Sequence, residues 1–599
     1  MISWMLIFIC IGLLGSGLGA SGIFFCHRRI LTFLAACGVF MQAWWMALTA
    51  LGLLWEVPDA ALPYMYGVGA FVPWIFIYMR RSSWTWPYQL PGSGKRDAWV
   101  FLPLLPALFF ALAVVGSNGP QADGSWVLHG FYNGDTTTFI SLVQKSLLAD
   151  SRQIDNPFGS GVPLEYPTFF HTSMAHALRL MGASLDWIYY LPVFVLTWVL
   201  LTIPLFFLLA DELLADVSQP FWGREAGIAA SALFVMSLSW DAYIYPQSHF
   251  FLMGLFLLGA AFFYKASGLS GRDFWLFSLA GSFLACLVLA SNAVTGTAAI
   301  ACTILFWFFV AQDNKRTVLA RLAGCAWVPI GLILFWQLSS GEPQFGMLHF
   351  AYSAVSDIII LLPAFIFLTV CGIYFLSRYS LATLFLGGLA GLALVTFFFS
   401  TRQIVVANAS RFMYHGLLLA FPLAVPFMER IFYFIRRELI HTTHSIAERL
   451  SGWTLIGICL VCVALPGLAS VASAADNLIF HKEHRVSLAE IEAYEWLALH
   501  TDVGSVVLTS PYSPWAVPVF SGRSLLRAKH VDSVAYWLSA DDSLLISQVA
   551  AFDGDKDMQR SVAPFADYLL LTKKDRPAWE PVPYQKMFDN GEVVIYQLR

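Results

Sequence analysis

The chain has 599 residues, of which 58% are hydrophobic and only 12% are charged. Soluble globular proteins average about 25% charged residues, and the mean hydropathy of this chain is +0.68. This composition excludes an ordinary soluble enzyme and indicates a polytopic membrane protein, so the lipid bilayer is its first expected partner. The net charge of −4 provides no basic surface for a nucleic acid.

About fourteen apolar runs before residue 475 are long enough to cross a bilayer as helices. The first run has neither a basic segment before it nor small residues at its end, so we interpret it as a span and not as a signal peptide. The predicted fold class is therefore a polytopic α-helical membrane protein. The expected spans are 3–25, 30–55, 63–79, 98–116, 187–210, 226–240, 248–265, 274–290, 296–311, 318–338, 357–377, 380–400, 411–433 and 453–475.

The loops between these spans alternate in charge. Outside the long loop at 117–186 and the C-terminal region, one alternate set contains all of the Lys and Arg residues except Arg402 and Arg411, which belong to the other set. The positive-inside rule assigns the first set to the cytoplasm. The N-terminus, the 117–186 loop and the C-terminal region are then expected outside the cytoplasm.

The long loop is predicted to contain two helices. Apolar residues at helical spacing predict a short amphipathic helix over 137–149, lying on the membrane face. A turn-rich segment follows at 156–163. A second helix is expected to begin near Pro167, a residue that suits the first helical position, and to end near Met181.

The residues after 475 have the composition of a soluble domain. The segment 487–499 predicts a helix that opens with a Ser-x-x-Glu capping box. Segments 504–509, 568–572 and 591–597 predict strands. We expect a small α/β domain on the outer face of the membrane.

Two carboxylates of the long loop are candidate catalytic residues. Asp135 precedes an apolar run, where it would serve either as a helix N-cap or as a general base. Glu165 precedes the second helix, whose dipole would stabilise its anion. If the fold brings the two together, they could accept a proton from a hydroxyl and stabilise a developing sugar cation. His171 and His176 are five residues apart, so they do not share a helix face as zinc ligands would.

Other polar residues lie in the short outer loops. Asp241 and His249 flank a tyrosine-rich turn and could extend the same pocket, although aromatic residues there also anchor a span at the interface. Asn292 and Thr295 are interpreted as a tight turn between two spans. Arg411 lies on the side of the membrane where the loops otherwise contain few cations. Its side chain therefore either extends to the membrane interface or binds an anion, and a phosphate is the natural candidate for that anion.

These residues, in this order, resemble the GT-C superfamily of integral-membrane glycosyltransferases. The C-terminal region is also similar to the extracytoplasmic domain of bacterial members. The resemblance begins near residue 98 and leaves three additional spans before it. It rests on Gly134-Asp135-Thr136, Asn156-Pro157-Phe158, Glu165-Tyr166-Pro167, His171, Glu495-Trp496-Leu497, the segment 520–523 and the segment 567–571.

The resemblance implies three parts: 1–97 with three extra transmembrane helices, a GT-C-like core at 98–475, and an extracytoplasmic α/β domain at 476–599. It implies inverting transfer of a sugar, in a bacterial plasma membrane, from a polyprenyl-phosphate-linked donor to a glycan, lipid or protein acceptor. Asp135 matches the acidic residue essential for transfer. The expected substrate-binding residues are Tyr166, His171, Asp241, His249, Arg411 and Arg402, of which Arg411 best matches the residue that meets the donor phosphate. The sequence does not decide the sugar, the acceptor or whether a divalent cation takes part.

Two other classes of protein remain open. A surface-polysaccharide polymerase or ligase also has many spans and a large outer loop, but the loop would be led by arginine. A transporter would have internal repeats and helices broken near the middle of the membrane, and the C-terminal domain would be unexplained.

Overall fold

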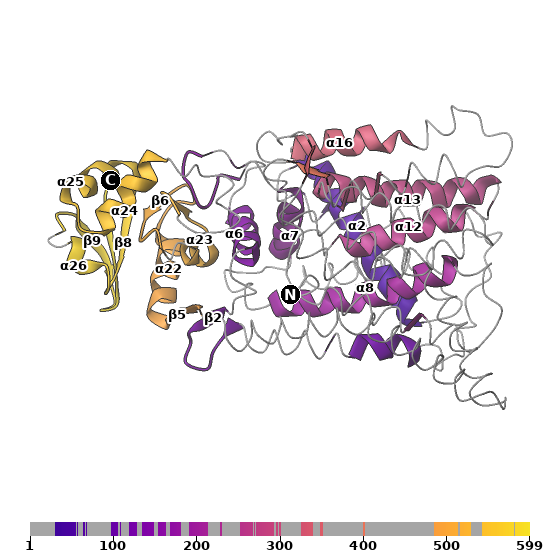
Figure 1. Cartoon of the computed structure of the whole chain (residues 1–599), viewed down its shortest axis with the longest axis horizontal. Helices are drawn as coiled ribbons and strands as arrows, with labels where there is room; N and C mark the ends of the chain where they lie inside the picture. The colour runs from indigo at the N-terminus through magenta and orange to yellow at the C-terminus, as the bar shows by residue number, and fades with distance from the viewer. Residues whose placement is uncertain are drawn as a thin grey trace, which may run out of the picture.

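The computed structural model of the chain describes residues 30–55, 98–105, 119–128, 135–148, 154–162, 168–180, 191–213, 252–267, 271–292, 325–338, 348–350, 399–401, 484–512, 515–528, 542–579 and 582–599, with single residues and pairs between them. The long apolar helices lie together at one end of the molecule and the C-terminal sheet lies at the other (Figure 1). Helices α6 (Asp135–Leu148) and α7 (Phe169–Leu180) lie side by side between these two parts (Figure 1).

The apolar part contains α2 (Ile30–Leu54), α8 (Leu191–Leu213), α12 (Met253–Ser267), α13 (Gly271–Ser291) and α16 (Trp327–Leu338). Helix α12 packs against both α8 and α13, and α2 packs against α8. Within the described residues, two helices are long and apolar enough to cross a membrane, Leu34–Leu54 in α2 and Phe274–Ser291 in α13. The spans expected at 3–25, 357–377, 411–433 and 453–475 lie outside the described residues, so the total of about fourteen stays a prediction.

Small residues allow α12 and α13 to approach closely. A Cβ atom added to Gly281 would lie 3.2 Å from the carbonyl oxygen of Gly259 and 3.2 Å from the ring of Phe263. Glycines at such crossings are typical of helices that pack by van der Waals contact in an apolar environment.

One expected span needs a correction at its end. Residues Phe399–Thr401 form strand β4, which pairs antiparallel with β3 (Leu348–Phe350). The helix expected over 380–400 therefore cannot continue through 399 and 400, because the backbone there bonds to another strand. The pairing joins two loops that the charge argument places on the same side of the membrane.

The C-terminal region forms a five-stranded mixed sheet. Its strand order is β7-β6-β8-β10-β9, with β6 parallel to β7 and β8, and β10 antiparallel to β8 and β9. The strands are β6 (Val506–Leu508), β7 (Ser524–Leu525), β8 (Tyr568–Thr572), β9 (Gln585–Asp589) and β10 (Val593–Gln597). The helices are α22 (Leu488–His500), α23 (Ala516–Ser521), α24 (Ser543–Phe552), α25 (Lys556–Val562), the 3-10 turn Ala563–Phe565 and α26 (Arg576–Trp579).

The predicted capping box at the start of α22 is confirmed. The backbone N–H of Glu490 donates to Ser487 Oγ at 3.3 Å, and the N–H of Ser487 donates to Glu490 Oε2 at 2.8 Å. The strands predicted at 504–509, 568–572 and 591–597 are present as β6, β8 and β10. These local signals were sufficient because each depends on residues close together in the chain.

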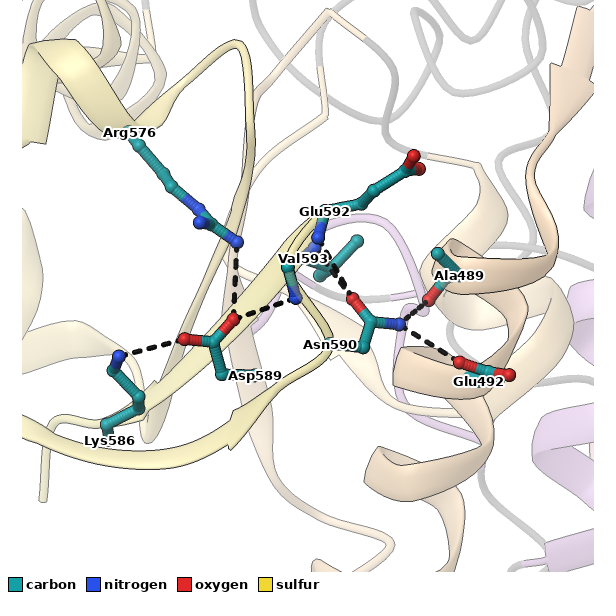
Figure 2. Close-up of polar contacts among 9 residues, drawn as sticks. Ala489, Glu492, Arg576, Lys586, Asp589, Asn590, Glu592 and Val593 are labelled. Carbon is teal, nitrogen blue, oxygen red and sulfur yellow. Dashed lines mark hydrogen bonds and ion pairs between the residues drawn. The ribbon is translucent and has the colours of Figure 1, made fainter.

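The turn between β9 and β10 is tied to the first turn of α22 (Figure 2). Asn590 Nδ2 donates to the carbonyl of Ala489 at 2.8 Å and to Glu492 Oε2 at 3.1 Å (Figure 2). The Asn590 Oδ1 atom accepts the N–H of Val593 at 2.9 Å, and Gly591 in the turn has a φ of 88°. The hairpin and α22 therefore form one packed unit.

The long loop and the C-terminal region also pair with each other. Strand β2 (Trp126–Leu128) lies between β1 (Gly119–Pro120) and β5 (His484–Val486), and it is antiparallel to both. Arg485 forms an ion pair with Asp123 beside this sheet. Both segments are expected outside the cytoplasm, so this contact is one that the predicted topology allows.

Candidate active site

Helices α6 and α7 run parallel to each other. Near their N-terminal ends, the rings of Phe139 and His171 lie 5.1 Å apart. Near their C-terminal ends, Arg179 Nε donates to the carbonyl of Leu147 at 2.9 Å. Both pairs are separated by 32 residues in sequence, so the two helices keep one offset along their length.

This parallel arrangement places the starts of the two helices at the same end. Asp135 is the first residue of α6, and Phe169 is the first residue of α7. Glu165 precedes Phe169 by four residues in the sequence. The positive ends of both helix dipoles, which stabilise anions, therefore lie at this end of the pair. The side chains of Asp135 and Glu165 lie outside the described part of the chain.

Arg179 of α7 joins the two helices at their C-terminal ends. Its Nη2 atom donates to the carbonyl of Ser146 at 2.8 Å, in addition to the bond from Nε to Leu147. A guanidinium at a helix C-terminus satisfies carbonyls that have no partner within the helix. Helix α7 is held in turn by α2, where Trp45 Nε1 donates to the carbonyl of Ser173 at 2.9 Å.

The helix predicted over 137–149 is present as α6, but its residues 137–147 leave no face exposed to solvent. All residues from 137 to 147 are buried. The polar face is covered by the C-terminal domain, where α23 packs against α6. Lys145 Nζ donates to Ser524 Oγ at 2.8 Å and to the carbonyl of Val503 at 3.0 Å. The amphipathic pattern therefore belongs to a buried helix that lies between an apolar layer and the polar surface of the C-terminal domain.

Two cations are buried at this contact. Burial lowers the pKa of Lys145 to about 8, and the charge of Arg523 lowers it further while Asp155 opposes the shift. Burial also lowers the pKa of Arg523 to about 10. Arg523 Nη2 donates to the carbonyls of Ala498 at 2.7 Å and Thr501 at 2.6 Å, so it caps the C-terminal end of α22.

The two histidines of the loop lie on α7. The His171 side chain is 1% exposed and contacts the rings of Phe139 and Phe170. It therefore contributes to the contact between α6 and α7, and its predicted role in substrate binding stays a prediction. Burial, reinforced by the charge of Arg179, lowers the pKa of His176 to about 4. In the described part of the chain, no group of three or more His, Cys, Asp or Glu side chains is placed to hold a metal ion.

Most of the other predicted site residues fall outside the described part of the chain, namely Tyr166, Asp241, His249, Arg402 and Arg411. Arg402 directly follows β4 in the sequence. The turn predicted at Asn292 is confirmed: α13 ends at Ser291, and Asn292 Oδ1 accepts the N–H of Thr295 at 3.1 Å.

The sequence reasoning gave no role to three cations, Lys145, Arg179 and Arg523, although Arg523 lies in the segment 520–523 on which the resemblance rests. The available signal was a lysine near the middle of the expected amphipathic helix and an arginine near the end of the next one. That signal is weak, because cations in these positions are usually solvated.

Comparison with known proteins gives a match at the level of structure. No family model matches the sequence, and no curated protein matches it at the level that indicates a relative. The oligosaccharyltransferase of Archaeoglobus fulgidus in the apo form is similar with a TM-score of 0.50 and 11% identity, over 80% of this chain and 70% of that chain. The same organism's AglB, in complex with an inhibitory peptide and a dolichol-phosphate, gives 0.50 and 10% over 80% and 70%.

ArnT from Cupriavidus metallidurans bound to undecaprenyl phosphate is similar with a TM-score of 0.51 and 11% identity, over 84% of this chain and 98% of that chain. The oligosaccharyltransferase and ArnT are both GT-C glycosyltransferases. The identity is low, so the comparison concerns the fold. The chain shares the fold of these proteins, which is the fold that its sequence resemblance predicted.

Proposed function

We propose that the protein is a membrane glycosyltransferase, which transfers a sugar from a polyprenyl-phosphate-linked donor to an acceptor outside the cytoplasm. The observation that carries the proposal is the parallel pairing of α6 and α7, which puts Asp135 at the end of the pair where Glu165 precedes α7. The GT-C fold supports the choice of donor. Structures with that fold contain a dolichol-phosphate in AglB and undecaprenyl phosphate in ArnT.

In the proposed reaction, a hydroxyl oxygen of the acceptor attacks the anomeric carbon of the donor sugar. The bond from that carbon to the phosphate oxygen breaks, and polyprenyl phosphate leaves with the electron pair. Asp135 accepts the hydroxyl proton, and Glu165 stabilises the cationic sugar of the transition state. The two helix dipoles favour ionised carboxylates, the form in which they perform these roles.

The leaving phosphate gains charge during transfer, so it needs a cation. Arg411 is proposed for this role, with Arg402 as the neighbouring alternative, because a guanidinium matches two phosphate oxygens at once. Tyr166, His171, Asp241 and His249 are proposed to contact the substrates. Attack from the face opposite the phosphate inverts the anomeric configuration.

The first test is Asp135→Asn, which retains the size of the side chain and some capping ability. We expect transfer to fall by about 10²–10⁴-fold, the usual loss for a general base, with expression and melting temperature nearly unchanged. Transfer is measured by mass spectrometry of surface glycans and lipid-linked sugars in a deletion strain that carries each variant. The matched control is Asp557→Asn on α25, whose side chain is 85% exposed. Parental transfer by Asp135→Asn would leave Asp135 only the role of an acidic residue in the first turn of α6.

The donor site is tested separately with undecaprenyl phosphate as the probe. Arg411→Ala should weaken its binding by about 1.5–3 kcal/mol, the contribution of a charged hydrogen-bonded contact. Arg411→Lys should restore only part of the lost affinity, because an ammonium group cannot donate two parallel hydrogen bonds as a planar guanidinium does. If Arg411→Ala binds undecaprenyl phosphate as the parent does, the phosphate contact must be sought at Arg402.

A further inference from the structure

The C-terminal domain contacts the C-terminal half of α6 through buried polar groups. Lys145 is 2% exposed, and its Nζ atom reaches Ser524 on β7 and the carbonyl of Val503 before β6. These partners lie more than 350 residues away in sequence. A lysine fully enclosed in this way is uncommon, since Lys is among the residues least often buried.

The same edge of the sheet is fixed to the long loop. The N–H of Leu525 donates to the carbonyl of Pro157 at 2.9 Å, and the N–H of Ser160 donates to the carbonyl of Leu525 at 2.9 Å. Arg527 adds a bond from Nη1 to the carbonyl of Ser160 at 2.7 Å. These bonds fix β7 and Arg527 to the segment 157–160 of the long loop, which follows α6 in the chain.

The close fit between α23 and α6 gives a second indication of a fixed contact. Gly522 ends α23 with a φ of 67°, and a Cβ atom there would lie 2.4 Å from Leu148 Cδ1. The positive φ favours glycine at this position, and the Leu148 side chain would have to shift to accommodate a methyl group there.

Burial penalises the charge of Lys145, so this side chain adds little net stability to the contact. Its hydrogen-bond acceptors, Ser524 and Val503, are neutral, and the charged groups that act on it are Asp155, which favours its charge, and Arg523, which opposes it. Arg523 in turn is influenced by Asp502 and Tyr568. Even a complete buried ion pair contributes little net stability relative to apolar residues of similar size, and the acceptors of Lys145 provide no opposite charge. Buried polar groups of this kind can instead select one packing arrangement over others.

We propose that Lys145 is a positioning residue for the transfer reaction: its bonds to Ser524 and Val503 fix where α6, and with it Asp135 at the first position of the helix, lies against the C-terminal domain. This inference rests on the proposed function. It makes the C-terminal domain a part of the catalytic apparatus, although none of its residues needs to touch a substrate. A displacement of about 1 Å at a reacting group can cost about 10²-fold in rate.

The contact should also depend on pH in a defined direction. The pKa of Lys145 is about 8 in the docked state against 10.5 for a free lysine. Between these values the undocked state binds more protons, so docking becomes more favourable as pH rises through this window. After correction for intrinsic exchange, amide protection in 135–148 should be greater at pH 9 than at pH 7 in the parent. The difference should be absent in a variant that lacks the lysine.

The test uses Lys145→Met in the full-length protein in lipid nanodiscs, with Lys586→Met as the control, because Lys586 is exposed on β9 and pairs only locally with Asp589. For Lys145→Met we expect a small decrease in melting temperature, because the buried Ser524 Oγ loses its partner, and unchanged binding of undecaprenyl phosphate. We expect faster hydrogen exchange in 135–148 and loss of its pH dependence. Transfer should fall by about 10- to 100-fold. Lys586→Met should match the parent in every measurement.

A second variant, Ser524→Ala, retains the lysine and removes one of its two acceptors, so it provides the test if Lys145→Met does not fold. It should reduce transfer in the same direction by a smaller factor. The inference is overturned if either folded variant transfers sugar at the parental rate with parental exchange in 135–148. If the parent itself transfers no sugar, the proposed function fails, and the exchange and pH measurements still decide whether Lys145 fixes α6.

Discussion

Arg179 provides a direct test of the parallel pairing of α6 and α7. Its guanidinium donates to the carbonyls of Leu147 and Ser146, at 2.9 Å and 2.8 Å, and so joins the C-terminal ends of the two helices. Arg179→Met removes both bonds and the cation but retains much of the apolar stem. Arg179→Lys retains the charge but reaches at most one carbonyl well, because an ammonium is a point charge and not a planar fork.

The expected magnitude follows from these contacts. A hydrogen bond to a charged group contributes about 1.5–3 kcal/mol, and the value for Arg179 lies at the lower end because its side chain is only partly buried. Two such bonds give about 3 kcal/mol, and a cation at a helix C-terminus adds up to about 1 kcal/mol. Since every 1.4 kcal/mol is tenfold in an equilibrium constant, opening of α6 should rise by roughly 10²–10³-fold in Arg179→Met. Arg179→Lys should show about half of this free-energy change.

The assay is hydrogen exchange measured by mass spectrometry on the full-length protein, with the peptides that cover 135–148 as the readout. Arg560→Met is the matched control, because Arg560 is 81% exposed and its pair with Asp557 is solvated. Such a change is expected to stay within about 0.5 kcal/mol. The parallel pairing would be the wrong description of the site if α6 exchanged at the parental rate in Arg179→Met. Transfer should fall together with protection, because Asp135 lies on the same helix.

Three further predictions concern packing, pH and topology. Gly296→Ala should lower the melting temperature in detergent, since its Cβ would lie 2.7 Å from Leu289 Cα and overpacking costs about 1–3 kcal/mol; Gly504→Ala, with no atom within 4 Å, should leave it unchanged. His176 has a pKa of about 4 in the folded state against 6.5 for a free histidine, so its contribution to stability is complete above pH 6.5 and is lost as pH falls toward 4. His176→Leu should therefore make the melting temperature depend less on pH between pH 7 and pH 4. An unchanged dependence on pH would assign the acid sensitivity to other groups. A reporter fused after Arg599 should lie outside the cytoplasm and one inserted at 434–451 inside; the same side for both would contradict the charge argument.

The sequence was informative wherever a structural signal is local. The capping box at Ser487 located the start of α22 to the residue, because both of its hydrogen bonds join residues three positions apart. The starts of α6 and α7 fell within about two residues of the predictions, since the apolar periodicity and Pro167 mark them directly. Asp135 was identified as a candidate because it stands where an apolar helix begins.

The sequence was uninformative where the signal depends on distant partners. Nothing near Lys145 in the chain indicates that residue 503 supplies one of its acceptors. The pairing of β2 with β5 joins segments at 126–128 and 484–486, and strands of three residues have too little pattern to predict a partner. Whether α6 and α7 run parallel is likewise undetermined by their sequences, because the connection between them is long enough for either direction.

The burial of the polar face of α6 changes how the C-terminal domain should be understood. A domain that only tethered a substrate could contact the membrane part through a solvated surface, and its removal would leave α6 with an ordinary polar face. Here Lys145 and Gln144 are 2% and 1% exposed under that domain, and the loop residues at 157 and 160 complete their hydrogen bonds on β7. Removing the domain would therefore take away both acceptors of Lys145 and expose the face of α6 that α23 covers. Helix α6, which begins at Asp135, and the sheet of the C-terminal domain thus belong to one folded unit, even though hundreds of residues separate them in the chain.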